Sequence, residues 1–258
     1  MEKTVLITGG SRGIGAACVE TFALAGYRVA FTYNRHQSAA MATAARVQAQ
    51  LLDAGFPHPQ ERILALPLDL GKEDAGAALQ ETARQALIYF GAPGFDACVA
   101  NAGISGTELL DRMPEERLRR IINVDLVGAI LTCRAVIPRM IERKEGAIVL
   151  LSSVWGQRAA AGETVYAAAK AGLIGFGKSL AAELGPSGIR VNLLCPGVID
   201  TDMNAEHTPE TLRDLAGKTP LMRLGEPREV AEAALFLCGS GASFITGQVL
   251  GIDGGFGI

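Results

Sequence analysis

The sequence predicts an α/β fold: a single doubly wound domain of about seven parallel strands, with helices on both faces of the sheet. Apolar, β-rich runs alternate with helical patterns from one end of the chain to the other, which is the order that builds βαβ units with right-handed crossovers. Runs such as Ala147–Leu151 are continuously apolar, as is typical of strands buried on both faces of a parallel sheet. No linker or internal repeat divides residues 1–258, so we expect one domain.

The elements follow in chain order. The expected strands are 4–8, 28–33, 63–68, 95–100, 146–151, 190–195 and 248–252. The expected helices are 13–25, 38–54, 72–90, 114–142, 164–184 and 227–238. Residues 54–61 contain one glycine and two prolines, which predicts a surface loop. Residues 200–218 follow a strand end with weak periodicity, and ligands of such sheets bind outside the carboxyl ends of the strands, so we expect this excursion to cover a substrate.

Composition narrows the classes of function. The net charge is −3 and both signs are mixed along the chain, so we expect no nucleic-acid partner. The three histidines (His36, His58, His207) lack metal-ligand spacing, and we expect no metal site. The five cysteines are far apart with no Cys-x-x-Cys pair, which suits a reducing compartment. We see no signal-peptide pattern and no apolar run long enough to span a bilayer, so we expect a cytoplasmic protein without a membrane partner.

A glycine-rich turn separates the first expected strand from the first expected helix. Glycine allows a tight turn and a close backbone approach, and the following helix N-terminus offers free N–H groups to an anion. A glycine cluster alone is also typical of ordinary turns, but this position is where a dinucleotide site requires it. The turn residues expected to bind a cofactor are Gly9, Ser11, Arg12, Gly13, Ile14 and Gly15.

The second expected strand ends without an acidic residue, although an Asp or Glu there usually binds the ribose 2′-hydroxyl of NAD. The chain instead has Asn34 and Arg35 after the strand, and Arg12 in the glycine turn. Two cations near the adenosine ribose favour a 2′-phosphate through charge-assisted hydrogen bonds. The sequence therefore predicts NADP(H) as the cofactor, unless both arginines are solvated surface charges.

Tyr166 and Lys170 are four residues apart in an alanine-rich helical stretch, so they share a helix face. A phenol titrates near pH 10, roughly, and a neighbouring ammonium is expected to lower that value. The pair can thus act as a proton donor and acceptor. This spacing is common by chance, but Ser153 follows the fifth expected strand, where its hydroxyl can bind a carbonyl.

These pieces together resemble the short-chain dehydrogenase/reductase family, of the classical type. The matching residues are the turn from Thr8 to Gly15, Asn101–Gly103, Asn123, Ser153, Tyr166, Lys170, and Pro196–Gly197. They come in the order and near the spacing of the family, and the resemblance covers almost the whole chain. It implies a Rossmann-type fold and hydride transfer between a nicotinamide cofactor and a carbonyl or alcohol. One departure is Ala100, where the family often has a first asparagine.

The resemblance also implies roles. Ser153 would polarise the carbonyl, Tyr166 would be the general acid or base, and Lys170 would lower the pKa of the tyrosine and bind the nicotinamide ribose. Asn123 would hold a water of the proton relay, unless it only packs the helix. Asp69 would contact adenine, or else cap a helix. Further cofactor contacts would come from Leu70, Asn101, Ala102, Gly103, Pro196, Gly197, Val198, Ile199 and Thr201.

Within the family the chain is most similar to 3-oxoacyl-[acyl-carrier-protein] reductases, through Gly9–Gly15, Tyr166–Gly172, Gly188–Asn192, Ile245–Gln248 and Asp253–Gly255. The resemblance implies a 3-oxoacyl thioester substrate, an acyl carrier protein as partner, and a homotetramer with helices 114–138 and 164–184 at the interface. A carrier protein is acidic, so Arg134, Arg139, Arg143 and Lys144 are candidates for a basic patch at the cleft mouth, or else for a solvated helix end.

Two other functions stay open from the sequence. A dehydrogenase of the same fold acting on a small ketone, sugar or steroid-like alcohol would share the catalytic residues and differ in its pocket. A non-catalytic, cofactor-sensing protein is the third hypothesis, and the intact Ser153, Tyr166 and Lys170 argue against it. Trp155 and Gln157 follow Ser153 and are expected to face the substrate.

Overall fold

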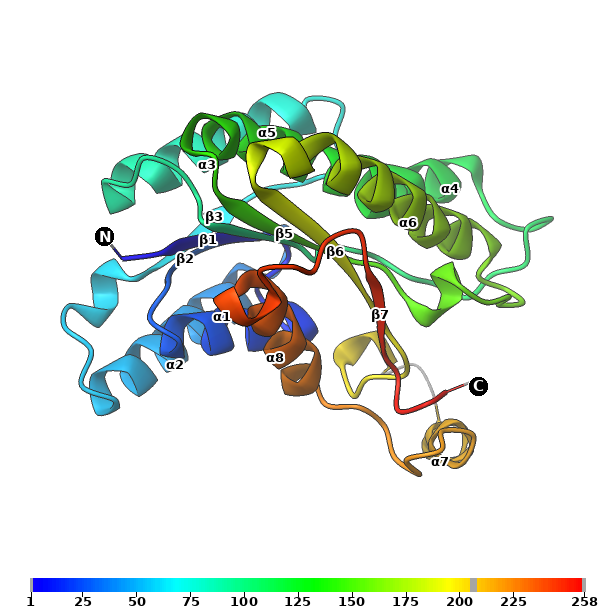
Figure 1. Cartoon of the computed structure of the whole chain (residues 1–258). Helices are drawn as coiled ribbons and strands as arrows, with labels where there is room; N and C mark the ends of the chain where they lie inside the picture. The colour runs from blue at the N-terminus through cyan, green and yellow to red at the C-terminus, as the bar shows by residue number, and fades with distance from the viewer. Residues whose placement is uncertain (1, 205–207, 257–258) are drawn as a thin grey trace.

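The computed structural model describes residues 2–204 and 208–256, and within them seven parallel strands form one sheet in the order β3-β2-β1-β4-β5-β6-β7 (Figure 1). The strands are β1 (Thr4–Ile7), β2 (Arg28–Tyr33), β3 (Ile63–Pro67), β4 (Ala97–Ala100), β5 (Gly146–Leu151), β6 (Ile189–Pro196) and β7 (Val249–Ile252). The helices are α1 (Gly13–Leu24), α2 (Gln37–Asp53), α3 (Ala75–Phe90), α4 (Glu115–Ile122), α5 (Gly128–Arg143), α6 (Thr164–Leu184), α7 (Pro209–Gly217) and α8 (Pro227–Cys238). This confirms the predicted fold class.

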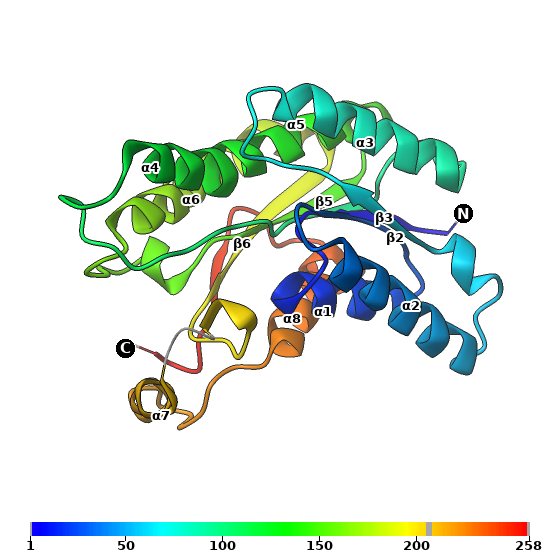
Figure 2. The same cartoon turned by 180° about the vertical axis from the view of Figure 1, so that it is seen from behind.

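Helices cover both faces of the sheet. Helices α1, α2 and α8 lie on one face, and α3, α5 and α6 lie on the other (Figures 1 and 2). Every residue of β1, β4 and β5 is buried, since each of these strands has a helix layer above and below it. The chain winds outward from β1 to β3 and then returns to β4 beside β1, so a crevice opens where the strand order reverses.

The predicted boundaries differ from the observed ones by at most three residues, with one missed helix. β4 begins at Ala97 rather than at residue 95, and α3 begins at Ala75 rather than at residue 72. The expected surface loop 54–61 ends in a short 3₁₀ turn, Pro59–Glu61. The excursion 200–218 contains the 3₁₀ turn η5 (Asp202–Asn204) and the helix α7; residues 205–207, His207 among them, lie outside the described residues.

The expectation that no apolar run could span a bilayer is wrong. The helical stretch Glu115–Arg143 has an 18-residue window of mean hydropathy 1.7 and is long and apolar enough to cross a membrane by length and composition. Its apolar side chains have another partner, since Cys133, Val136 and Met140 pack into the core against the sheet. The apolar face of this stretch is therefore explained by the fold.

The same stretch changes its helical geometry in the middle. Between α4 and α5, residues Asn123–Val127 form the π-helical turn η2. The backbone N–H of Gly128 donates to the carbonyl of Asn123, five residues earlier. Such turns insert one extra residue into the helix and are frequent at functional sites.

Candidate functional site

A cleft with a volume of about 430 Å³ runs along the carboxyl ends of the strands, in the size range of small-molecule sites. The predicted site residues that line it are Gly9, Ser11, Arg12, Gly13, Ile14, Gly15, Asn34, Arg35, Asp69, Leu70, Asn101, Ala102, Gly103, Ser153, Tyr166, Lys170, Pro196, Gly197, Ile199 and Thr201. Of the predicted set, Asn123 and Val198 are not among the described residues that line it, and Val198 lines a neighbouring hollow instead.

The glycine turn is clamped to the end of β4. The Thr8 hydroxyl accepts hydrogen bonds from the backbone N–H groups of Asn101 (3.1 Å) and Ala102 (3.2 Å). In return the Asn101 side-chain amide donates to the carbonyls of Thr8 (2.9 Å) and Gly9 (3.1 Å). Asn101 therefore holds the glycine turn against the end of β4.

The turn leaves space for a phosphate. A Cβ on Gly15 would lie 2.0 Å from the Gly9 carbonyl oxygen, and Gly9 and Gly13 have φ angles of +72° and +55°. Only glycine fits such a close and left-handed path. No side chain caps the N-terminus of α1 at Arg12, so its N–H groups are available to an anion. The turn fits the pyrophosphate of a dinucleotide.

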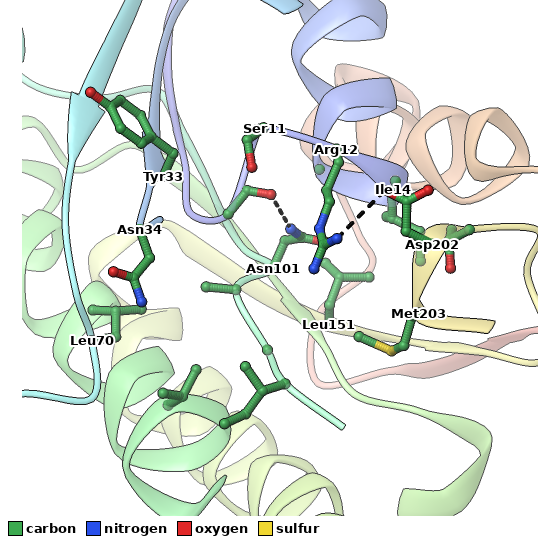
Figure 3. A pocket seen from close by; sticks show the side chains of 18 of the residues that line it. Ser11, Arg12, Ile14, Tyr33, Asn34, Leu70, Asn101, Leu151, Asp202 and Met203 are labelled. Atoms are coloured by element: carbon green, nitrogen blue, oxygen red, sulfur yellow. Dashed lines mark hydrogen bonds and ion pairs between the residues drawn. The ribbon is translucent and has the colours of Figure 1, made fainter. Parts of the chain in front are cut away.

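Arg12 and Arg35 both line the cleft. Arg12 reaches toward the excursion after β6, and its Nη1 lies 3.5 Å from the Asp202 carboxylate (Figure 3). Both side chains are more than half exposed, at 53% and 65%, so the pair is weak. Asn34 and Arg35, directly after β2, line the cleft. Asp202 and Met203, from the excursion after β6, line it as well.

Asp69 does not cap a helix. Its Oδ1 accepts the backbone N–H of Gly71 at 2.9 Å, which closes a turn after β3, while α3 begins at Ala75. Arg120 of α4 approaches the same carboxylate, with 3.4 Å between Nη2 and Oδ1, and also lines the cleft. Sequence reasoning missed Arg120, and nothing in its neighbourhood distinguishes it from the other arginines of α4.

Ser153, Tyr166 and Lys170 meet at the other end of the cleft. Ser153 follows β5, and its Oγ accepts the backbone N–H of Trp155 at 3.2 Å. Tyr166 and Lys170 project from α6, and the Lys170 Nζ lies 5.5 Å from the Tyr166 ring centroid. The Nζ donates to the Leu151 carbonyl at 3.0 Å, so the carboxyl end of β5 fixes the lysine beneath the tyrosine.

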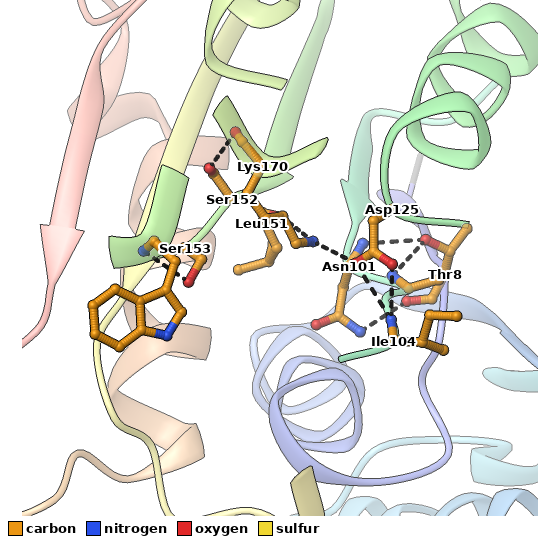
Figure 4. A network of polar contacts seen from close by, with 10 residues as sticks. Thr8, Asn101, Ile104, Asp125, Leu151, Ser152, Ser153 and Lys170 are labelled. Carbon is orange, nitrogen blue, oxygen red and sulfur yellow. Dashed lines mark hydrogen bonds and ion pairs between the residues drawn. The ribbon is translucent and has the colours of Figure 1, made fainter. Parts of the chain in front are cut away.

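An acidic residue completes this cluster. Asp125, in the turn η2, has no exposed surface, and its Oδ1 lies 3.2 Å from the Lys170 Nζ. Its Oδ2 accepts the backbone N–H of Ile104 at 3.1 Å (Figure 4). Sequence reasoning missed Asp125, although a signal was present: a carboxylate inside an apolar helical run is buried only with a partner.

Asn123, which the family resemblance assigns to the proton relay, lies in the same π-helical turn as Asp125. It begins η2, and its carbonyl accepts the long-range N–H of Gly128. Arg120 and Val124 line the cleft on either side of it in sequence. The structure brings Asp125 to Lys170, and the role of Asn123 in the proton relay stays a prediction.

Burial dominates the titration of the cluster. Burial raises the pKa of Tyr166. The charge of Lys170 acts to lower this pKa and the charge of Asp125 acts to raise it, and the net pKa of Tyr166 is raised. Burial works to lower the pKa of Lys170, but the charges of Asp125 and Tyr166 outweigh it and raise that pKa. Burial also raises the pKa of the Asp125 carboxyl against the opposing effect of Lys170. The expected net lowering of the tyrosine pKa is therefore not what this arrangement produces.

The predicted basic patch is not at the cleft mouth. Arg143 pairs with Asp96 and donates to the Phe95 carbonyl at 3.2 Å, and both partners directly precede β4. The side chains of Arg139 and Arg143 also lie against Gly94. The end of α5, with Lys144 after it, thus lies at the amino ends of the strands, opposite the cleft, because α5 runs antiparallel to them. Arg134 does not line the cleft either.

The chain matches known proteins along nearly its whole length. The family model described as enoyl-(acyl carrier protein) reductase matches residues 9–257. A 3-oxoacyl-[acyl-carrier-protein] reductase, FabG of Chlamydia trachomatis, is 40% identical over 255 residues, which are 99% of this chain and 97% of the relative. The chain belongs to the short-chain dehydrogenase/reductase family. Within that family it resembles the 3-oxoacyl-[acyl-carrier-protein] reductases.

Other short-chain dehydrogenases/reductases are nearly as similar. Carbonyl reductase family member 4 of Xenopus tropicalis is 39% identical, with 99% of this chain and 98% of the relative covered. A solved double mutant of a short-chain dehydrogenase/reductase from Serratia marcescens superposes with a TM-score of 0.87 at 34% identity and covers 99% and 98% of the two chains. Membership of the family makes this chain an oxidoreductase that uses a nicotinamide cofactor.

Proposed function

We propose that this protein is an NADPH-dependent reductase that converts a 3-oxoacyl thioester to the 3-hydroxyacyl form. The observation that carries the proposal is the cluster of Ser153, Tyr166 and Lys170 at one end of a cleft whose other end is the glycine turn. The substrate class is supported by the FabG relative, which is 40% identical over nearly the full length of both chains. Residues 1–258 would form one catalytic domain.

Each side chain has a distinct part in this reaction. The nicotinamide cofactor, when bound, supplies a hydride to the carbonyl carbon. Ser153 donates a hydrogen bond to the carbonyl oxygen and polarises it. Tyr166 transfers its hydroxyl proton to that oxygen as the C–O double bond becomes single, and the resulting phenolate is stabilised by the Lys170 ammonium. In the reverse direction Tyr166 is the base.

The preference for NADPH rests on Arg35 and Asn34 after β2. Both line the cleft, where a guanidinium binds a phosphate better than it binds a hydroxyl. Arg12 is a second cation, available because its exposed pair with Asp202 is weak. The cofactor would further contact the turn residues Ser11, Gly13, Ile14 and Gly15, then Asp69, Leu70, Ala102 and Gly103, and near the nicotinamide Pro196, Gly197, Val198, Ile199 and Thr201.

A reductase of small ketones is the second candidate, and it is supported by the relative named carbonyl reductase family member 4 at 39% identity. The position of Arg139, Arg143 and Lys144 away from the cleft also removes the expected docking patch for an acidic carrier protein. The two candidates differ in carrier dependence. Three kinds of substrate should be assayed with NADPH and with NADH: the acetoacetyl thioester of acyl carrier protein, the acetoacetyl thioester of coenzyme A, and a panel of small ketones. Failure to reduce any acetoacetyl thioester would refute the first proposal.

The catalytic assignment is tested by Tyr166→Phe. We expect it to abolish turnover, because no other group would donate the proton, while NADPH still binds in a fluorescence titration. Tyr89→Phe is the matched control, since Tyr89 is an exposed tyrosine of α3 and should not affect turnover. Turnover near the wild-type rate in Tyr166→Phe would contradict the mechanism.

The assembly and the location of the protein are part of the proposal. A homotetramer is supported by exposed apolar side chains: Val127 lies on a helix expected at the interface, and Phe236, Phe244 and Leu250 lie near the edge strand β7. Light scattering coupled to gel filtration measures the mass directly. A cytoplasmic location is supported by the five free, buried cysteines, which suit a reducing compartment.

A further inference from the structure

The ion pair between Asp125 and Lys170 joins two groups that are almost completely inaccessible to water. The side chains are 0% and 4% exposed, with 3.2 Å between Oδ1 and Nζ. Each partner has a second anchor: the Asp125 Oδ2 accepts the Ile104 N–H at 3.1 Å, and the Lys170 Nζ donates to the Leu151 carbonyl at 3.0 Å. Breaking such a pair leaves a buried charge without a partner, which is energetically costly, so both groups are held in one geometry.

The backbone of Gly103 packs against the pair. A Cβ on Gly103 would lie 2.7 Å from the Asp125 Oδ1 and 3.3 Å from the Lys170 Nζ, so the Gly103 backbone is packed directly on it. Gly103 and Lys170 both line the cleft. The Asp125 carboxylate is fully buried and does not line the cleft, and it lies beside Lys170 and Ile104 (Figure 4).

We propose that Asp125 is a positioning residue of this active site, which fixes the Lys170 ammonium and offsets its charge so that Tyr166 stays in the protonated, proton-donating form. This inference rests on the proposed function, in which Tyr166 and Lys170 act in the reaction. Reduction starts from the phenol and oxidation starts from the phenolate, so a protonated Tyr166 makes the site ready for carbonyl reduction at neutral pH.

The electrostatic reason is simple. A negative charge raises the proton affinity of every group near it. Tyr166 and Lys170 titrate as a coupled pair, whichever of them carries the proton. Asp125 acts to raise the pKa of both Tyr166 and Lys170. Removing its charge should therefore lower the pH at which the pair releases its first proton.

Other titratable groups face the cluster, and they do not replace Asp125. Glu163, just before α6, acts on Tyr166 in the same direction as Asp125 but more weakly. The Cys195 thiol of β6 acts on Lys170 as the smallest of its influences. Ser153 acts to lower the tyrosine pKa through a side-chain hydrogen bond. Asp125 is the anion in direct contact with Lys170, so its removal has the largest expected effect.

The test is Asp125→Asn, which keeps the shape and leaves an oxygen for the Ile104 N–H. One unit charge several ångströms away, at an effective dielectric constant of about 20, shifts a titration by roughly one to two pH units. We expect the basic limb of the pH profile of kcat/KM for carbonyl reduction to move down by that amount. The acidic limb for alcohol oxidation should move in the same direction. Unchanged limbs, or limbs that move up, would overturn the proposal.

A matched control separates this effect from a general change of charge. Glu142→Gln removes one negative charge from the far end of α5, where Glu142 pairs with Arg139, and should leave both limbs in place. A lower kcat in Asp125→Asn without any shift of the profile would indicate a merely structural role and would refute the assignment. Circular dichroism of both variants checks that the fold is retained.

A second measurement does not depend on turnover. The near-ultraviolet phenolate absorbance of the wild type, minus that of Tyr166→Phe, reports the titration of Tyr166 alone. The proposal expects Tyr166 to ionise above the pH of an ordinary phenol, and ionisation near neutral pH would overturn it. If no carbonyl substrate is reduced, the proposed function fails, while the same titration repeated in Asp125→Asn still decides the role of Asp125: Tyr166 should ionise at a lower pH than in the wild type, and an unchanged titration would overturn the proposal.

Discussion

Arg35 offers the sharpest test of the cofactor assignment. It lines the cleft directly after β2, and none of the ion pairs formed within residues 2–204 and 208–256 involves it. Its guanidinium is thus available to a 2′-phosphate without first breaking another pair. Arg35→Ala should weaken NADPH and leave NADH nearly unaffected, because only NADPH carries the phosphate.

The size of the effect follows from the kind of contact. Hydrogen bonds to a charged group contribute about 1.5–3 kcal/mol, which corresponds to a rise of roughly 10- to 100-fold in the KM for NADPH. Arg12→Ala should cost less, because Arg12 must first leave Asp202, its partner at 3.5 Å. That exposed pair contributes about 0–1 kcal/mol, and its loss is subtracted from the gain on binding phosphate.

Initial rates are measured at a fixed concentration of carbonyl substrate, with NADPH and NADH varied in turn. They give the KM for each cofactor in the wild type and in each variant. Arg134→Ala is the matched control, since it removes the same charge from an exposed position on α5 that does not line the cleft. An unchanged KM for NADPH in Arg35→Ala would refute the reasoning. A wild-type enzyme that prefers NADH would refute it as well.

Further predictions concern the turn, a helix and the core. Gly15→Ala places a Cβ 2.0 Å from the Gly9 carbonyl oxygen, so the turn or α1 must move; we expect weaker cofactor binding and a lower Tm. Gly175→Ala, whose Cβ meets nothing within 4 Å, should instead stabilise α6 by about 1 kcal/mol, and a loss of stability there would contradict the argument. All five cysteines are free and buried, and burial raises the pKa of Cys18 and Cys133 to about 12. A thiol reagent should therefore find five reactive thiols after unfolding in denaturant and react slowly with the native protein; rapid labelling of the native protein would show that the core opens.

The features predicted correctly share a local cause. Apolar runs indicate strands that are buried on both faces, and the glycines from Gly9 to Gly15 indicate a backbone conformation that only glycine can adopt. Tyr166 and Lys170 are brought onto one face by the helical repeat alone. These signals depend on a few neighbouring residues, so the fold class, the place of the cleft and most of its lining are predictable from the sequence.

The errors share a different cause, which is contact between segments distant in sequence. The sequence did not predict the buried partner of Lys170, because the π turn at 123–127 brings Asp125 to that lysine from a different helix. The basic end of α5 is absent from the cleft mouth because α5 runs antiparallel to the strands and carries Arg143 to Asp96 at the opposite end. The sequence did not predict the pair between Arg12 and Asp202, since Asp202 comes from a segment after β6.

The sequence by itself determined the fold class, the family and the identity of the groups Ser153, Tyr166 and Lys170, because periodicity and motif order are properties of the chain. Only the tertiary structure decided the electrostatic state of those groups. The direction of the pKa of Tyr166 depends on burial and on Asp125, which lies forty-one residues earlier in the chain. Charges interact through space with a strength set by their distance and the local dielectric constant, and both quantities depend on the folded structure rather than on the order of residues in the chain.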